Sequence, residues 1–359
     1  EQLHRELDGR IKLGTNTITG EEYYLEIAEN SKLEPVTDDM ALAPPSLQNG
    51  RKMVITDAEN GWFLRVDHIK HYGTDRQLEE LTIHPQGPMV FLNIDAAPNS
   101  TALIWEHTQD SPGKPCPNPR VVVPRTYFPT RHGEVVNVDL RSFGVRTPPC
   151  TREKPTYGVV GMFHVLSPSL AWLWRLVAPR GHANPSITDT EGMSSEGVGS
   201  YWPFATGKMV DQANILLRQI VDTPETRYVL IPNQFIGACH VGFKAEWIAR
   251  EYLARRGSAK YREDELKASK VSVLGYHMRK VKLDGNYIPR MFLDVSQQPE
   301  VGQEAFEKGG QMLTEFFRKE LQQYLTPELD PLGRQIIEAF LNGATVEEFN
   351  QFIPFQSMM

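Results

Sequence analysis

The first half of the chain is divided into short apolar runs, and this pattern does most to limit the folds open to it. Between about Lys52 and Val160 the runs are rich in β-branched and aromatic residues and are separated by Gly, Pro, Asn and Asp. Such runs predict strands, because branched side chains suit a pleated surface. The runs are MVITD, WFLRVD, PMVFLNID, TALIWE, RVVVP, EVVNVDL and YGVVGMFHVL. The first half is therefore predicted to be mostly β-sheet.

The second half has helical periodicity instead. In MVDQANILLRQIV the apolar residues recur at helical spacing, and RYVLIP after it has the composition of a strand. KAEWIAREYLARRG predicts a helix that ends at Gly257, because glycine readily adopts the left-handed conformation of a C-terminal cap. EAFEKGGQMLTEFFRKELQQYL predicts a longer helix, and Thr345-x-x-Glu348 has the capping-box pattern of a helix start. We therefore predict the α/β class, an α+β chain with a mixed sheet and a helical C-terminal end.

Composition excludes several classes of protein. The 359 residues carry a net charge of -7 and contain no long run of Lys or Arg, so no nucleic-acid partner is expected. No apolar stretch approaches the roughly 18 residues that cross a bilayer, so no membrane partner is expected either. Cys116, Cys150 and Cys239 are far apart in the sequence. This spacing predicts neither a disulfide framework nor a zinc site and favours a reducing cytoplasm.

Two carboxylates lie together in the stretch ITDAENGW. Asp57 ends a β-branched run and Glu59 follows on the next turn. The C-terminal edge of a strand is where α/β enzymes place the acids that hold a metal ion bound to nucleotide phosphates. The simpler interpretation is an acidic turn between two strands, and spacing alone favours it.

Two arginines bracket the run RVVVP. Arg120 begins the run and Arg125 follows it. A guanidinium at this position can bind a phosphoryl group through two parallel hydrogen bonds, or it can pair with a neighbouring acid. The residues by themselves leave both alternatives open.

The stretch TDTEGMSSEGVGSYWPFATGK, here called the glycine-serine loop, mixes close glycines with the adjacent Ser194 and Ser195. That composition suits a loop that lies against a ligand and suits an ordinary surface loop equally well. Trp172, Trp174 and Trp202 can line an interface or fill a core, and core filling is the expected use.

The order of these stretches resembles that of a known enzyme family. VITDAENGWFL resembles the IGDDEHGW stretch of ATP-type phosphoenolpyruvate carboxykinases, and NPRVVVP resembles their NTRVSYP. YGVVGMFHVLSPSL, the glycine-serine loop, YVLIPNQFIG and the segment from YIPRMFLDV to FFRKELQQYL resemble later stretches of that family in the same order. The chain looks most like an uncharacterised bacterial family that resembles the C-terminal catalytic domain of these carboxykinases. That domain would span residues 53–325, with 1–52 as a remnant or linker of a longer protein and 326–359 as a helical extension.

The resemblance implies roles for individual residues. Aligned on the shared Gly-Trp pair, Asp57 falls on the family's first aspartate and Glu59 on the following glutamate, whereas the metal-binding aspartate falls on Ala58. Asp57 and Glu59 are then the candidate ligands of Mg²⁺ or Mn²⁺. Arg120 falls on the arginine that contacts the transferred phosphoryl group. The family's phosphate loop lies upstream of this strand, and residues 1–52 contain no such loop.

The resemblance also implies a nucleotide, ATP or another, with His240, Lys244, Ser194 and Ser195 as its candidate binding residues. The family's lysine-arginine pair at the nucleotide base falls on Cys239 and His240. The predicted function is nucleotide- and divalent-metal-dependent phosphoryl transfer to a small-molecule acceptor, of a kinase-like or carboxykinase-like kind. The alternative is a non-catalytic ligand-binding or regulatory module that has kept the fold but lost the phosphate loop and the central metal aspartate.

Overall fold

The computed structural model describes two compact units. The described residues are 8–29, 36–37, 41–66, 68–69, 71–92, 109–111, 114–115, 119–127, 134–147, 158–177, 209–232, 234–242 and 244–354. Unit 1 comprises Glu34–Gln48 and Val54–Asp139, and unit 2 comprises Gln2–Leu33, Asn49–Met53 and Leu140–Met359. Each unit has its own apolar core.

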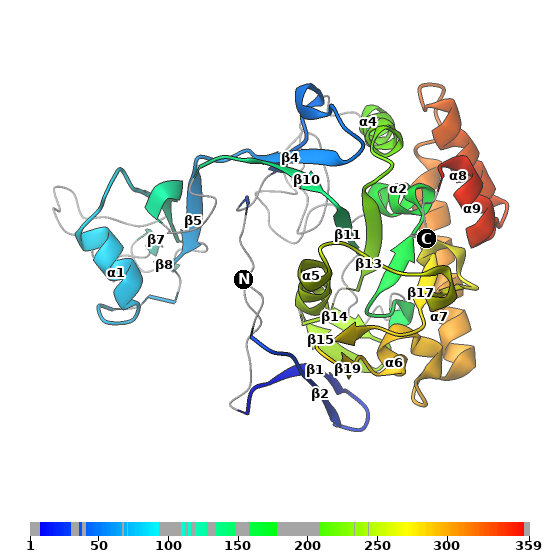
Figure 1. Ribbon diagram of the computed structural model, residues 1–359, viewed down its shortest axis with the longest axis horizontal. Helices are drawn as coiled ribbons and strands as arrows, with labels where there is room; N and C mark the ends of the chain where they lie inside the picture. Colours follow the sequence, from blue (N-terminus) through cyan, green and yellow to red (C-terminus); the bar gives the residue numbers. More distant parts are fainter. Residues whose placement is uncertain are drawn as a thin grey trace. The chain divides into compact units, whose positions relative to one another are not determined.

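Helix α2 (Pro168–Leu176) lies at the centre of unit 2, between a five-stranded sheet and the C-terminal helices (Figure 1). All of its residues are buried, the polar Ser169 and Arg175 among them, as expected of a mostly apolar helix. Trp172 Nε1 donates a hydrogen bond to the carbonyl of Ala213 at 2.9 Å, and Trp174 Nε1 donates to the carbonyl of Val273 at 2.5 Å. The prediction that these two tryptophans fill the core is confirmed.

The five-stranded sheet of unit 2 is mixed. Only its first two strands, β11 and β13, run parallel, and each further pair is antiparallel. In spatial order the strands are β11 (Ser142–Arg146), β13 (Arg227–Ile231), β12 (His164–Leu166), β17 (Tyr276–Met278) and β16 (Leu266–Ala268). The expected α/β class with a mixed sheet is confirmed, with several small antiparallel sheets beside it.

A second sheet of unit 2 joins the N-terminal residues to the middle of the chain. Its order is β14 (Gln234–Ile236), β15 (Cys239–Gly242), β1 (Arg10–Asn16) and β2 (Glu22–Glu26), and all neighbours are antiparallel. Residues of the 1–52 segment therefore pair directly with the strand that carries His240, which lies opposite Thr15.

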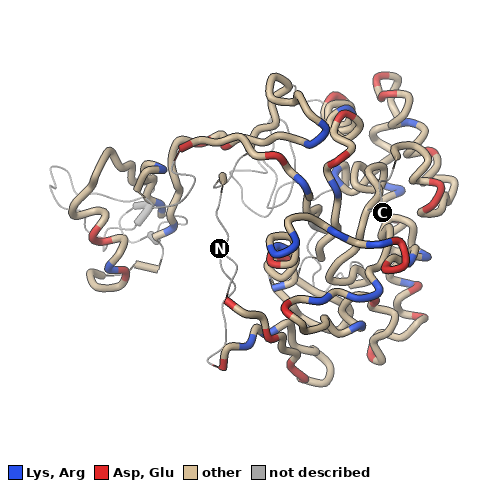
Figure 2. The backbone as a smooth tube through the Cα atoms, in the orientation of Figure 1, with Lys and Arg blue, Asp and Glu red and all other residues tan. Residues whose placement is uncertain are grey.

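The predicted helices of the second half are present. MVDQANILLRQIV forms α4 (Met209–Asp222), and KAEWIAREYLARRG forms α5 (Lys244–Arg256), which ends where Gly257 takes a left-handed φ of +70°. The long predicted helix is α7 (Gly302–Gln322). These helices carry both acidic and basic residues, as Figure 2 shows for the C-terminal part of unit 2.

The C-terminal end is helical, as predicted. Helix α6 (Arg290–Leu293) precedes α7, and α8 (Pro331–Leu341) and α9 (Val346–Phe352) follow it. At the start of α9, Glu348 N donates to Thr345 Oγ1 at 3.3 Å and Thr345 N donates to Glu348 Oε2 at 2.7 Å. These two bonds are the predicted capping box, which satisfies backbone N–H groups that the helix itself leaves unpaired.

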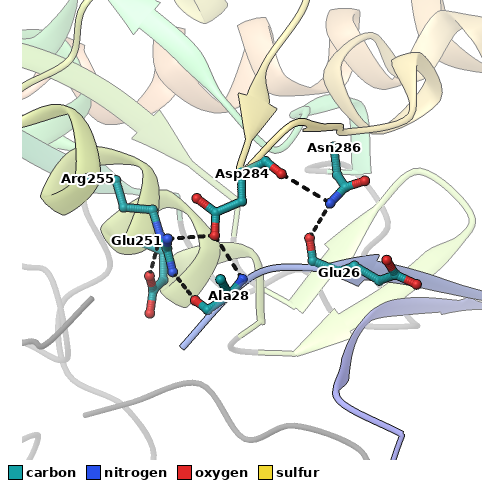
Figure 3. Close-up of polar contacts among 6 residues, drawn as sticks. All are labelled: Glu26, Ala28, Glu251, Arg255, Asp284 and Asn286. Atoms are coloured by element: carbon teal, nitrogen blue, oxygen red, sulfur yellow. Dashed lines mark hydrogen bonds and ion pairs between the residues drawn. The ribbon is translucent and has the colours of Figure 1, made fainter. Parts of the chain in front are cut away.

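Arg255 joins two other segments of unit 2 to helix α5 (Figure 3). On α5 its Nε donates to Glu251 Oε2 at 3.0 Å, and its Nη1 donates to Asp284 Oδ2 at 2.6 Å. Its Nη2 donates to the carbonyl of Ala28, just after β2.

Asp284, at φ +46°, forms with Gly285 the two-residue turn between β18 (Lys282–Leu283) and β19 (Asn286–Tyr287). Asp-Gly is a preferred sequence for such a turn. The residues drawn are Glu26, Ala28, Glu251, Arg255, Asp284 and Asn286.

The predicted strand over YGVVGMFHVL is wrong for most of its length. Only His164–Leu166 is a strand. Ahead of it, Met162 N donates to the carbonyl of Phe292 at 2.6 Å, and a Cβ on Gly161 would lie 2.4 Å from the carbonyl oxygen of Leu293. The backbone here packs directly against the backbone of α6, so it does not extend the sheet.

Unit 1 contains two small three-stranded sheets and helix α1 (Arg76–Ile83). Strands β5 (Gly61–Arg65), β9 (Arg120–Pro124) and β6 (Val90–Leu92) form one sheet, with β9 in the middle. The other contains β10 (Asn137–Leu140), β4 (Met53–Asp57) and β3 (Ala41–Leu42), and the hairpin β7 (Gln109–Ser111) and β8 (Lys114–Pro115) is separate. The predicted run TALIWE lies outside the described residues.

In the part of the chain that the structure describes, no helix combines the length and the apolar character that crossing a membrane requires.

Gly161 gives a direct test of the contact between the segment before β12 and α6. We expect Gly161→Ala to lower the free energy of unfolding by roughly 1–3 kcal/mol, because its methyl group would meet backbone atoms that cannot rotate away. Gly50→Ala is the matched control, since a Cβ at Gly50 has no heavy atom within 4 Å. Urea unfolding followed by circular dichroism measures both variants. Equal midpoints for the two would contradict the described contact.

Candidate functional site

The acidic turn of unit 1 holds a buried ion pair. Asp57 ends β4, and Arg125 lies in the 3-10 helix η3 (Arg125–Tyr127) that follows β9. Arg125 Nη1 donates to Asp57 Oδ2, and the two side chains are 4% and 0% exposed. Arg125 Nη2 donates to the carbonyl of Val36 at 2.9 Å, and its guanidinium lies 4.5 Å from the centroid of the Trp62 ring. For Arg125, the structure therefore adopts the acid-pairing alternative.

This pair is held in place by its surroundings. Burial lowers the pKa of Arg125 from its ordinary value. A guanidinium nevertheless stays charged at neutral pH. Asp57 supplies the compensating charge, and Trp62 contributes its ring face and donates from Nε1 to the Arg125 carbonyl at 3.4 Å. A buried charge without its partner is strongly unfavourable, so each member of this pair requires the other.

Glu59 completes the acidic turn. Its backbone N–H donates to Asp57 Oδ1 at 3.1 Å, so both carboxylate oxygens of Asp57 accept hydrogen bonds from the protein. Among the described residues, no group of three or more His, Cys, Asp or Glu side chains is gathered as a metal site would require. The structure thus places the two predicted metal ligands on one turn, and metal binding by Asp57 and Glu59 stays a prediction.

Arg120 differs from Arg125 in its surroundings. It begins β9, it is half-buried, and no hydrogen bond or ion pair within the described part of the chain engages its guanidinium. The antiparallel register places Arg120 directly opposite Arg65 of β5. Just beyond this pair, Val66 N donates to the carbonyl of Pro119 at 3.0 Å, which fixes the two strand ends together. Sequence reasoning missed Arg65, because only the strand register places it beside Arg120.

The predicted nucleotide-binding residues lie in unit 2. His240 is exposed on β15, and its ring centroid lies 5.0 Å from that of Phe235. Lys244 begins α5, and its Nζ lies 5.5 Å from the centroid of the Trp247 ring. Ser194 and Ser195 lie outside the described residues. The predicted site residues therefore form two groups, with Asp57, Glu59 and Arg120 in unit 1 and His240 and Lys244 in unit 2.

Cys239, next to His240, is buried and free. Burial raises the pKa of its thiol to about 11, and the charges of Glu300 and Glu21 add to the effect. The thiolate is the nucleophilic form of cysteine. Cys239 is therefore a packing residue and not a reactive thiol at neutral pH.

A second cluster of titratable groups lies at the centre of unit 2. His164 on β12 is directly opposite His277 on β17, and the two ring centroids are 4.6 Å apart. The backbone N–H of Gly161 donates to His164 Nε2 at 2.7 Å. A ring nitrogen that accepts a hydrogen bond carries no proton, so His164 is neutral with its proton on Nδ1. We call these two residues the histidine pair.

Burial dominates the electrostatics of the histidine pair. It lowers the pKa of His164 well below 6.5, and the neighbouring His277 lowers it further. Burial also lowers the pKa of His277, although the charge of Asp294 opposes this. Asp294 accepts from Ser296 Oγ at 2.6 Å and from Lys267 Nζ at 3.4 Å. No sequence motif joins His164, His277 and Lys267, because strand register brings these three together.

One family model, described as Domain of unknown function (DUF4914), matches residues 1–353 of the chain. No curated protein matches the chain.

The buried ion pair predicts strong coupling between its two members. We expect Asp57→Leu and Arg125→Met each to lower the free energy of unfolding by about 3–5 kcal/mol, because each leaves one buried charge unpaired. The double variant should lose much less free energy of unfolding than the two single variants lose in sum. A double-mutant cycle by urea unfolding measures the coupling.

The exposed pair Lys12–Glu22 is the control and should show far weaker coupling. Additive losses at Asp57 and Arg125 would contradict the structural role of the pair.

The histidine pair predicts a loss of stability in mild acid. The folded chain holds His164 neutral, whereas the unfolded chain takes up a proton near the ordinary pKa of 6.5. The free energy of unfolding is therefore at its full value above about pH 6.5 and falls as the pH drops below it.

Chemical unfolding between about pH 5 and pH 7.5 measures this slope. His164→Gln keeps an acceptor for Gly161 and cannot titrate in this range, so it should flatten the slope. His84→Gln, at a side chain that is 73% exposed, should leave it unchanged. An unaltered slope in His164→Gln would show that other groups cause the acid sensitivity.

Proposed function

Because the chain belongs to the DUF4914 family, whose description names no activity, we propose a function from its own residues, namely binding of a phosphoryl-bearing ligand through Arg120. The observation that carries this proposal is the contrast between Arg120, which begins β9, and Arg125, which directly follows that strand. Arg125 is buried and bound to Asp57, whereas no described residue engages the Arg120 guanidinium.

The position of Arg120 suits an anionic ligand. Its backbone is held in the middle strand of a sheet, between β5 and β6, so the site is built on a rigid element. A guanidinium offers a planar fork of N–H donors that matches the oxygens of a phosphoryl group. Its half-buried position also reduces screening by water, which strengthens a charge-assisted hydrogen bond.

Phosphoryl transfer is the specific activity that we propose for this ligand site. In a kinase-like or carboxykinase-like reaction, Arg120 would neutralise charge on the transferred group, and catalysis would consist mainly of positioning and electrostatics. ATP or another nucleotide is the proposed donor. Contacts of that nucleotide with His240, Lys244, Ser194 and Ser195 stay a prediction from the sequence resemblance. The acceptor is proposed to be a small molecule.

A divalent metal ion is part of this proposal. Carboxylate oxygens are the ligands that Mg²⁺ and Mn²⁺ prefer, and the turn supplies them from Asp57 and Glu59. Arg125 already neutralises part of the charge on Asp57, so the ion would be bound by Asp57 and Glu59 together. The ion would add positive charge against the phosphate oxygens.

The same ion pair favours a second candidate function, a non-catalytic ligand-binding or regulatory module. Arg125 occupies Asp57 Oδ2 and the Glu59 N–H occupies Asp57 Oδ1, while Ala58 between them has no ligating side chain. A turn whose principal carboxylate stabilises the fold is well suited to a protein that binds a phosphoryl-bearing ligand without transferring it.

Arg120→Ala tests the proposal directly. Isothermal titration of the full chain with ATP and Mg²⁺ should show at least about a tenfold loss of affinity, since a hydrogen bond to a charged group contributes about 1.5–3 kcal/mol. Arg76→Ala, at an exposed arginine of α1, should bind as the natural chain does. Equal affinity in the Arg120 and Arg76 variants would remove Arg120 from the site.

The same titration with EDTA in place of Mg²⁺ separates the two candidates. Phosphoryl transfer predicts that affinity falls without the ion and that Glu59→Gln behaves in Mg²⁺ as the natural chain does in EDTA. Affinity that depends on Arg120 but is indifferent to both the ion and Glu59 would favour the non-catalytic module.

A further inference from the structure

The hairpin of β18 and β19 in unit 2 is firmly held on its inner side. Val281, Leu283 and Ile288 are buried in the core of unit 2, and Ile288 N donates to the carbonyl of Val281 at 3.0 Å. At the turn, Asp284 Oδ2 accepts from Ala28 N at 2.8 Å. These contacts fix the backbone of the hairpin, so the side chains on its outer side project from a rigid element.

The outer side of this hairpin carries two lysines and one aromatic ring. Lys280 and Lys282 are exposed, whereas the residues that follow each of them are buried. Because successive side chains of an extended chain point to opposite sides, both lysines lie on the outer side. Tyr287 is directly opposite Lys282 and 58% exposed, and Lys282 Nζ lies 5.2 Å from the centroid of its ring. We call residues 279–290 the basic hairpin.

The basic hairpin has an excess of positive charge. It contains one carboxylate, Asp284, and four basic side chains, namely Arg279, Lys280, Lys282 and Arg290. The carboxylate is already paired with Arg255 of α5, whose Nη1 lies 2.6 Å from Asp284 Oδ2 (Figure 3). Within the described ranges of the chain, no ion pair involves Lys280, Lys282 or Arg290. The positive charge of the outer side is therefore available to a partner.

The net charge of -7 does not cancel this local surface. At physiological salt, exposed charges more than about 8 Å apart are largely screened from each other. A partner at the basic hairpin therefore meets positive charge, although the chain as a whole is acidic. Binding to a nucleic acid depends on neutralising many phosphates at once, and a surface with four basic side chains suits a smaller acidic partner better.

The spacing of the lysines fits an extended acidic segment. Lys280 and Lys282 are two residues apart on one side of an extended chain, which separates them by about 7 Å. Alternate side chains of any extended segment repeat at this same spacing, so two carboxylates of such a segment can pair with both lysines. Tyr287 supplies a large ring beside them, and tyrosine is one of the residues enriched at the centres of protein interfaces.

We propose that the basic hairpin docks an extended acidic segment of a partner protein. The carboxylates of the segment pair with Lys280 and Lys282, and the Tyr287 ring packs against its backbone and methylene groups. This surface belongs to unit 2 alone, and the inference does not depend on the function proposed for Arg120. A partner held in this way binds through charge complementarity, which favours fast and salt-sensitive association.

The experiment titrates the full chain with a short synthetic peptide in which Glu alternates with Ser, and anisotropy of a fluorescent label on the peptide measures binding. Affinity should fall as NaCl is raised. The double variant Lys280→Gln, Lys282→Gln should bind about fivefold more weakly or worse, because it removes two ion pairs. Lys280→Arg with Lys282→Arg keeps both charges and should retain the affinity.

The ring is tested in the same titration. Tyr287→Ser should weaken the peptide about fivefold, as expected for an aromatic residue at the centre of an interface, and Tyr287→Phe should bind as the natural chain does. The matched control is Lys308→Gln with Lys319→Gln, at two exposed lysines of α7. This control should leave the affinity unchanged, and circular dichroism checks that every variant is folded.

Four outcomes would overturn the inference. The first is that the Glu-Ser peptide does not bind, and the second is that the variants at Lys280 and Lys282 bind it as the Lys308 and Lys319 control does. The third is that a Gln-Ser peptide binds equally well, which would show that charge is not recognised. The fourth is tighter binding of a short oligodeoxythymidine through the same lysines, which would replace the acidic protein segment by a nucleic acid.

Discussion

Unit 2 depends on the complete burial of α2. A helix with no exposed side must be surrounded, and each of its polar side-chain groups needs a partner inside the protein. Trp172 donates to the carbonyl of Ala213 on α4, and Trp174 donates to the carbonyl of Val273 in the segment before β17. At the end of the helix, Tyr324 Oη donates to the carbonyl of Leu176. These bonds select one arrangement of segments that apolar packing alone would hold less specifically.

The structure of unit 1 depends instead on where its charged side chains lie. The chain RVVVPR places one arginine at each end of a short apolar strand, and the fold treats the two differently. Arg125 turns inward, where Asp57, the Trp62 ring and the Val36 carbonyl surround it. Arg120 lies opposite Arg65, one residue out of step with the core-facing side chains of β9. The buried arginine stabilises the unit, and Arg120 is the residue on which the function that we propose is based.

The histidine pair shows a different use of strand register. His164 and His277 are neutral, closely packed and linked to the backbone of Gly161 and Leu293. Gly161 in turn contacts α6 through its backbone. The titratable groups at the centre of unit 2 thus lie at the junction where Gly161 packs against the backbone of α6, so protonation there would disturb packing as well as charge.

The sequence by itself determined those helices, caps and strands that depend only on residues close together in the chain. The amphipathic helices, the left-handed glycine after α5, the capping box of α9 and the strands MVITD and RVVVP follow from neighbouring residues, and the structure confirms them. The strand over YGVVGMFHVL was wrong because a contact with α6, distant in the sequence, competes for its backbone.

Only the tertiary structure decided which arginine is buried, that Arg65 lies beside Arg120, and that two distant histidines share one face of a sheet. The physical reason is that strand register and long-range packing depend on residues far apart in the chain, and a shift of one residue would turn each of these side chains to the opposite face.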